Sequence, residues 1–222
     1  MMKANMSFAL CAALCAATLA PCAYAEEVDP EFGPTVTIAG KGRFALVDAG
    51  LGDPKPLQAV ARTIANFMMI NVGVEKRAWT FAGASAALKD TKATAAVFVT
   101  KDKALPLSLI AMEARWGVVN AEGLTAKQVE KEVLRVSAVL LGGASSKYPA
   151  SVMRPVFSTA DLDKAGELLT VDSLMAIMSN LEDNGFSSRR DMTYREACEQ
   201  GVAPAPKTDL EKKIAAEVKA AR

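Results

Sequence analysis

The chain has 222 residues, a formal net charge of +1 and no histidine. The lack of histidine excludes the usual zinc sites, the Ser-His-Asp triad and the Cys-His dyad, because each of them uses imidazole as a ligand or a base. A near-neutral chain with 6% aromatic residues also lacks the excess of basic residues typical of nonspecific nucleic-acid binding, so we expect no nucleic-acid partner.

Residues 1–25 have the layout of a secretory signal peptide. Lys3 precedes an apolar run over residues 8–19, and an Ala-Tyr-Ala sequence ends at Ala25 before an acidic start. The apolar run is shorter than the roughly 18 residues of a membrane-spanning helix. We therefore predict cleavage after Ala25, a secreted or periplasmic location, and no membrane span in the mature chain.

Three of the four cysteines lie in the predicted signal peptide, so the mature chain keeps only Cys198. A single cysteine cannot form an intramolecular disulfide, and the fold must therefore depend on its hydrophobic core. We interpret Cys198 as a half-buried helical residue, with an intermolecular bridge as the alternative. A lipid anchor at Cys22 is a further alternative, but Pro21 fits a lipobox poorly.

The first half of the mature chain alternates between predicted strands and helices. Residues 26–34 are acidic, contain two prolines and are interpreted as a leader. Beyond them, β-branched and apolar runs predict strands, while apolar residues at three- and four-residue spacing predict helices. In chain order these are strands at 35–38 and 43–47, a helix at 57–70, a strand at 78–81, a helix at 84–89, and strands at 95–100, 107–112 and 116–120.

The second half is predicted to be mostly helical. The clearest helix spans 125–141, where Thr125 and Gln128 form the capping-box pattern and Gly142 follows the last apolar residue. Further helices are predicted at 159–167, 171–183, 193–200 and 208–221. The expected fold class is α+β, with a mixed β-sheet, one central buried helix and a helical C-terminal lobe. We expect a single domain over 35–222, with the sheet and central helix in 35–143 and the lobe in 144–222.

The central helix also carries a motif pattern. Residues 131–145 read Lys-Glu-Val-Leu-Arg-Val-Ser-Ala-Val-Leu-Leu-Gly-Gly-Ala-Ser. Metzincin proteases have His-Glu-x-x-His-x-x-Gly-x-x-His at such a helix, with the histidines binding zinc and the glutamate acting as the base. With the motif glycine at Gly142, the three ligand positions fall on Arg135, Val139 and Ser145, and the base position falls on Val136. Met153 lies where the family has its methionine turn.

Residues 95–220 resemble the metzincin family, and its archaemetzincin branch in particular, in their order of strand, helix, glycine, loop and methionine. The same stretch resembles a group of uncharacterised secreted bacterial proteins, through the sequences at 116–120, 151–158 and 201–206. The resemblance implies a metzincin-like fold. An ordinary buried helix that ends at a glycine is the alternative interpretation of the motif.

The residues at the motif positions do not suit zinc. Zinc takes nitrogen, sulfur or carboxylate ligands, whereas Val139 has no donor atom and Arg135 carries a fixed positive charge. We therefore expect neither metal nor cofactor, and no protease activity. Because an unpaired buried guanidinium is costly, Arg135 should meet a carboxylate, either from Glu132 or from the C-terminal lobe.

These features lead to three functional hypotheses. The favoured one is a metal-free pseudoenzyme that binds a peptide, a protein or an envelope component between the sheet edge and the central helix. The second is a non-metal hydrolase that uses Ser145 or Ser146 with Lys147 and Arg135. The third is a purely structural envelope protein.

Overall fold

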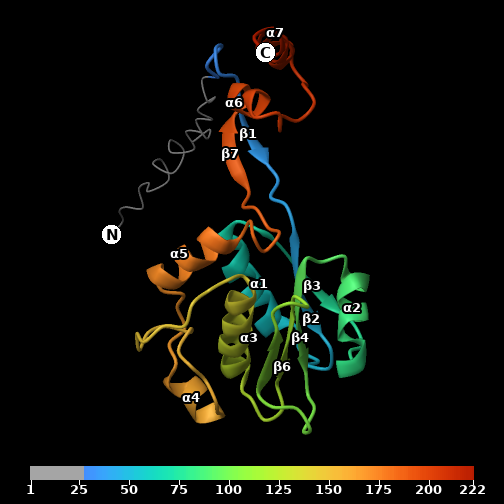
Figure 1. Cartoon of the computed structure of the whole chain (residues 1–222), viewed down its shortest axis with the longest axis vertical. Helices are drawn as coiled ribbons and strands as arrows, with labels where there is room; N and C mark the ends of the chain where they lie inside the picture. Colours follow the sequence, from blue (N-terminus) through green and yellow to red (C-terminus); the bar gives the residue numbers. More distant parts are fainter. Residues whose placement is uncertain (1–27) are drawn as a thin grey trace, which may run out of the picture.

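The computed structural model describes residues 28–222, so the predicted signal peptide lies outside the described residues. Figure 1 shows a body built around a β-sheet and a smaller distal part at the other end of the molecule, which holds the C-terminus. The distal part is joined to the body through the long segments that include β1 and β7. Among residues 28–222, no helix combines the length and apolar character needed to cross a membrane.

The body contains a five-stranded sheet with the order β3-β2-β4-β6-β5. Neighbouring strands are parallel except for β5, which is antiparallel to β6. Of the three inner strands, β4 and β6 are buried along their whole length, which explains why all of their residues before the last one are apolar or glycine. The bounds are Arg43–Asp48 for β2, Asn71–Lys76 for β3, Ala95–Thr100 for β4, Ser108–Ala111 for β5 and Trp116–Asn120 for β6.

Helices cover both faces of this sheet. Helix α1 (Lys55–Met68) connects β2 to β3, and helix α2 (Ala84–Thr91) connects β3 to β4, in the opposite direction across the sheet. Because connections between parallel strands share one handedness, the two helices lie on opposite faces. Helix α3 (Ala126–Leu140) packs beside α1, and both helices share one hydrophobic core with the sheet. A second, smaller core lies under α2.

Helix α3 has the start and the end that the sequence predicts. The Thr125 hydroxyl accepts a hydrogen bond from the Gln128 N–H, and the Gln128 side chain accepts one from the Thr125 N–H. At the other end the Gly142 N–H donates to the Val139 carbonyl and the Gly143 N–H to the Ala138 carbonyl, with Gly142 at φ +93°. This is a Schellman motif, in which a left-handed residue favours glycine.

The chain after α3 returns along the body through a loop and two helices, α4 (Thr159–Lys164) and α5 (Val171–Asn180). Ser151 and Leu168 form a parallel bridge, and the Val152 N–H donates to the Leu168 carbonyl at 2.8 Å. This bridge keeps Val152 and Met153 in the core that α3 shares with the sheet.

The distal part is built from both ends of the described chain. Strand β1 (Thr35–Ile38) pairs antiparallel with β7 (Arg190–Thr193), followed by α6 (Tyr194–Glu199) and α7 (Asp209–Ala220). Its small core is centred on Tyr194, Ile214 and Val218. The segment before β1 folds against α6, where the Arg195 N–H donates to the Phe32 carbonyl at 3.0 Å.

One sequence prediction about strands was wrong, and two strands, β3 and β7, were missed. Residues 78–81 do not form a strand: they lead into a 3₁₀ turn at Phe81–Gly83, and Trp79 stacks on Phe98 of β4 with 6.0 Å between ring centroids. The strand in this part of the chain is instead β3, at the edge of the sheet opposite β5. Its Asn71 and Gly73 are residues that strands rarely contain, so the sequence did not predict it. Strand β7 was also missed, because its polar sequence Arg-Asp-Met-Thr is extended only through its pairing with β1.

Candidate functional site

Arg135 lies on α3 and faces the edge strand β5. Its Nε donates to Oε2 of Glu132 at 2.8 Å, its Nη2 donates to Oε1 of the same carboxylate, and Nη2 also donates to the Ser108 hydroxyl at 3.0 Å. The Glu132 side chain is fully buried, whereas 14% of the Arg135 side chain is exposed. The ion pair expected for Arg135 is therefore present, and its carboxylate comes from the preceding helical turn rather than from the C-terminal lobe.

This ion pair holds a buried charge in place. A carboxylate without exposed surface is costly unless a cation and hydrogen bonds compensate it, and Arg135 supplies both in a two-point contact. Through Ser108, the same guanidinium also links α3 to β5. Arg135 thus fixes the position of the sheet edge relative to the helix.

The neighbouring motif positions are occupied by apolar packing. Val136, at the predicted base position, is fully buried above Gly117 of β6, where a Cβ atom would lie 2.6 Å from Val136 Cγ1. The missing side chain at Gly117 allows α3 to lie close to the sheet. Val139, one turn beyond Arg135, is partly buried and packs against the main core. Neither valine offers a base or a metal ligand.

Ser145, at the predicted third ligand position, lies on the exposed loop after α3. It lines a cavity of about 270 Å³ together with Lys147, Tyr148 and Asp172 at the start of α5. Arg135 is therefore paired with Glu132, Val139 packs against the core, and Ser145 lies on the surface. Within residues 28–222, no group of three or more His, Cys, Asp or Glu side chains is arranged to hold a metal ion.

Gly142 and Met153 both pack closely around the end of α3 and the loop that follows it. A Cβ atom at Gly142 would lie 2.5 Å from Cβ of Asn180, so the glycine permits close contact with the end of α5. Met153 is buried, and its carbonyl accepts a hydrogen bond from the Ser146 N–H at 2.9 Å. The loop after α3 is thereby closed over a buried methionine.

The geometry does not favour the serine–lysine alternative. The Ser146 hydroxyl is buried and accepts a hydrogen bond from the Tyr148 N–H at 3.2 Å. Lys147 is exposed, and within the described part of the chain no hydrogen bond joins its amine to Ser145 or Ser146. A serine nucleophile needs its base within hydrogen-bond reach, so this loop does not form such a pair.

Ser108 is the residue of this site that the sequence analysis missed. It is the single polar residue in the apolar run over residues 104–112, and this isolated position could have indicated a specific role.

Strand β5 lies at the edge of the sheet and pairs only with β6. The Leu107 carbonyl accepts a hydrogen bond from the Asn120 N–H at 2.9 Å. In an antiparallel pair, residues that bond to the partner strand alternate with residues that do not. The backbone N–H and C=O groups of Ser108 and Ile110 therefore point away from β6, toward the open edge.

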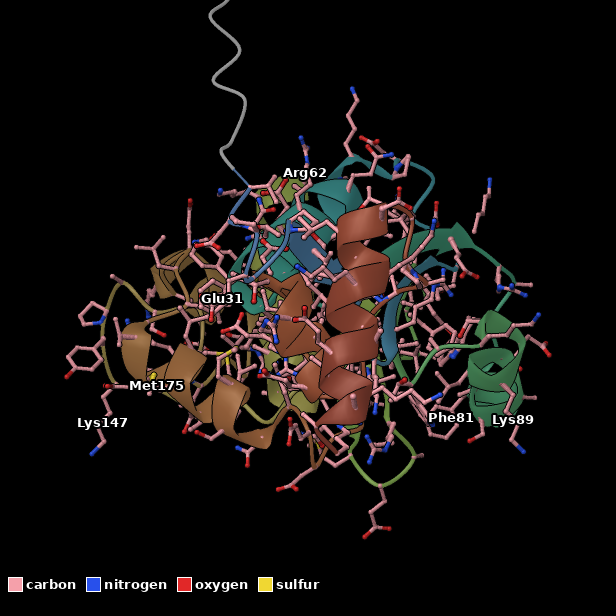
Figure 2. All side chains as sticks on the ribbon, turned by 90° about the horizontal axis from the view of Figure 1, so that it is seen from above. Glu31, Arg62, Phe81, Lys89, Lys147 and Met175 are labelled. Atoms are coloured by element: carbon pink, nitrogen blue, oxygen red, sulfur yellow. The ribbon has the colours of Figure 1, made fainter. Side chains whose placement is uncertain are left out.

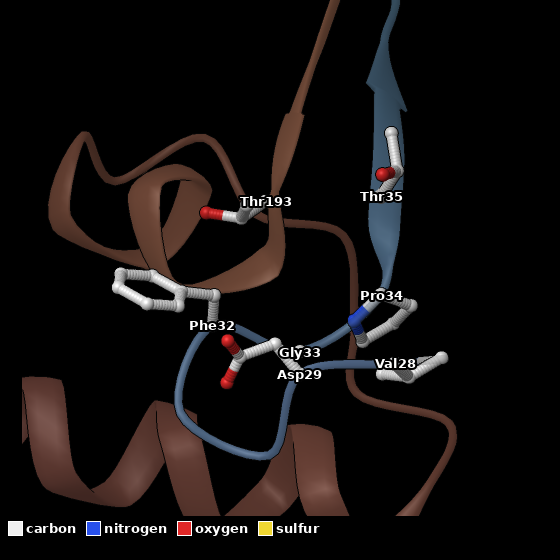
Figure 3. A pocket seen from close by; sticks show the side chains of 7 residues that line it. All are labelled: Val28, Asp29, Phe32, Gly33, Pro34, Thr35 and Thr193. Atoms are coloured by element: carbon white, nitrogen blue, oxygen red, sulfur yellow. The ribbon is translucent and has the colours of Figure 1, made fainter. Parts of the chain in front are cut away.

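A further cavity lies in the distal part, away from α3. Figure 3 shows this cavity of about 390 Å³, which is lined by residues of the segment before β1 together with Thr35 and Thr193. Its single carboxylate, on Asp29, accepts a hydrogen bond from the Glu31 N–H at 2.8 Å and so stabilises the local turn. We see no catalytic grouping in this cavity.

Comparison with known proteins shows a likeness in fold alone. No protein-family model and no curated protein sequence matches the chain. Among solved structures, the archaemetzincin from Methanopyrus kandleri superposes with a TM-score of 0.51 at 14% identity, covering 64% of this chain and 96% of the other. A zinc-dependent peptidase from Methanocorpusculum labreanum gives a TM-score of 0.49 at 9% identity, covering 61% of this chain and all of the other. The expected α+β, metzincin-like fold is confirmed.

Proposed function

We propose that this chain is an exported, metal-free protein with a metzincin-like fold that binds an extended peptide segment of a protein partner without cleaving it. The observation that carries the proposal is the ion pair between Arg135 and Glu132 at the first motif position. The fold resembles that of an archaemetzincin, but the helix uses this position for a charge pair and a contact with β5.

The chemistry of the three motif positions supports a non-catalytic role. A zinc site would need donors at all three, and they offer a guanidinium already bound to a carboxylate, an aliphatic side chain and an exposed hydroxyl. A cation at Arg135 would also be repelled by the fixed positive charge. These residues do not fit zinc, and no reaction step is assigned to it.

The edge of β5 supports a binding role. An open strand edge can accept an extended peptide as an additional strand, with affinity from main-chain hydrogen bonds. Ser108 and Ile110 present their backbone groups on this edge, and Arg135 holds Ser108 through its hydroxyl. The edge is therefore fixed before a peptide arrives, which lowers the entropic cost of binding.

Export is proposed from the sequence. Residues 1–25 have a charged start, an apolar run and a small-residue cleavage site. A mature chain beginning at Glu26 would meet its partner in the periplasm or outside the cell.

The test uses the purified mature chain, residues 26–222, and an immobilised library of random short peptides. We expect saturable binding of a subset of peptides, and mass spectrometry should show those peptides intact after incubation. Ser108→Pro removes an outward N–H and should abolish binding, whereas the matched variant Ser108→Ala keeps the backbone donor, loses only the hydroxyl contact with Arg135, and should bind more weakly without losing binding. Peptide cleavage by the parent, or equal binding by Ser108→Pro, would contradict the proposal.

A further inference from the structure

Helix α5 exposes an apolar stripe. Val171 and Met175 are 74% and 62% exposed, and Met178 is exposed as well, at positions i, i+4 and i+7 on one side of the helix. On the opposite side, Ser173 and Ile177 are buried against the body. Figure 1 shows α5 on the outside of the body, beyond α1 and α3. A surface helix normally exposes its polar side, so this arrangement marks an interaction surface.

The stripe continues onto the preceding loops. Leu168 is exposed and its N–H bonds to the Ala150 carbonyl, while exposed Tyr148 lines a cavity with Asp172 in the first turn of α5. Figure 2 shows Met175 and Lys147 on the same flank of the molecule. We call the combined surface the α5 face; it consists of Tyr148, Leu168, Val171, Met175 and Met178.

Charged side chains lie at both ends of the α5 face. At its first end, Lys147 and Asp172 line one cavity. At its other end, Glu182, Asp183 and Arg190 line a second cavity together with Met178. Among the described residues, none of these five side chains takes part in an ion pair. Between the two ends, residues 173–180 carry no charge.

We propose that the α5 face binds the same face of a second copy of this chain about a two-fold axis, with the two α5 helices antiparallel. This arrangement brings opposite ends of the face together, so Lys147 lies opposite Glu182 and Asp183 of the second copy, and Asp172 lies opposite its Arg190. The uncharged apolar stripes meet between them, with Met175 nearest the axis. In a parallel arrangement each charged group would instead face its own copy, Lys147 against Lys147 and Glu182 and Asp183 against themselves, which is why the charges favour the antiparallel one.

The apolar part of the proposal is tested by sedimentation equilibrium of the mature chain over a range of concentrations. We expect a monomer–dimer equilibrium. Met175→Lys should raise the dissociation constant at least about 30-fold, because it places two like charges at the centre of the interface. The matched control is Met112→Lys, which changes an exposed methionine outside the α5 face and should leave the constant unchanged.

The charged ends are tested by charge exchange. Glu182→Lys combined with Asp183→Lys should weaken the dimer about tenfold, and adding Lys147→Glu should restore it. A parent chain that is monomeric up to about 1 mM would overturn the proposal. A dimer that Met175→Lys does not weaken would overturn it too, as would a charge exchange that fails to restore association.

Discussion

Arg135 and Glu132 form a two-point ion pair within one helix, and the carboxylate partner has no exposed surface. The pair lies at the position where we place the first zinc ligand of a metzincin-like motif, as part of the proposal. Its guanidinium also reaches the hydroxyl of Ser108 on the edge strand. One arginine thus compensates a buried charge and connects the central helix to the edge at which we propose binding.

Arg135→Ala should lower the free energy of unfolding by about 3–5 kcal/mol, because it leaves the buried Glu132 carboxylate without a cation. Urea denaturation of the purified mature chain measures this. The matched control is Lys212→Ala, which breaks the exposed pair with Asp209 at the same i, i+3 spacing and should cost less than about 1 kcal/mol. Equal small losses in the two variants would show that the Arg135 pair is not a buried one.

Replacing both members of the pair provides a second comparison. The double variant Glu132→Leu with Arg135→Leu removes the carboxylate as well as the cation, so it should recover most of the stability lost in Arg135→Ala. A double variant less stable than Arg135→Ala would contradict the claim that the lone carboxylate causes the loss.

Gly117→Ala should destabilise the fold by about 1–3 kcal/mol, because the added methyl group would lie 2.6 Å from Val136 Cγ1 and push α3 away from the sheet. Val136→Ala removes the opposing methyl groups. The double variant should therefore be more stable than the sum of the two single changes implies, in a double-mutant cycle measured by urea denaturation. Strict additivity would show that the two residues are not in contact.

The Asp48 carboxyl should make stability depend on pH in the acidic range. Burial by itself would raise its pKa, but N–H groups of Gly50, Leu51 and Gly52 donate to Oδ1 and hold the pKa below its ordinary value. The ionised form therefore stabilises the fold above the unfolded pKa of about 3.9, and this contribution is lost as pH falls through the lower folded pKa.

Asp48→Asn keeps the shape of the side chain and removes its charge. The difference in unfolding free energy between the parent and this variant should be constant from about pH 5 to 8 and should shrink below about pH 4. Denaturation at a series of pH values measures the difference. If it grew as pH fell, the sign of the Asp48 contribution would be wrong.

Several parts of the fold could be predicted because the signal is local. The capping box at Thr125, the glycine stop at Gly142 and the largely apolar strands β4 and β6 are all visible in the sequence. Glu132 could be named as a partner of Arg135 because residues three apart on a helix are neighbours.

Other parts depend on contacts between distant segments. Strand β3 contains Gly73, where a Cβ atom would lie 2.3 Å from Nη2 of Arg43, whose guanidinium pairs with Glu75. Nothing in the sequence of β3 reveals that an arginine from β2 fills this space. Strand β7 likewise depends on its pairing with β1, which lies far from it in the sequence. The Thr37 hydroxyl donates to Asp191 Oδ1, and these two residues are 154 positions apart. Ser108 was missed because its partner lies on α3.

The export proposal predicts a mature N-terminus at Glu26, because the Ala-Tyr-Ala sequence ends at Ala25. N-terminal sequencing and intact-mass measurement of the protein from its native host would show this. A chain that starts at Met1 and stays with the membrane, or a lipid attached to Cys22, would contradict it.

The central proposal is that the Arg135–Glu132 pair occupies the position that a metal ligand would have in a zinc peptidase of this fold. Elemental analysis of the mature chain, purified without chelator and then equilibrated with excess zinc and desalted, tests this most directly. We predict far less than one zinc per chain and a melting temperature that does not change with chelator, for the parent and for Arg135→His alike. One tightly bound zinc per parent chain, with a melting temperature that falls on chelation, would contradict the account.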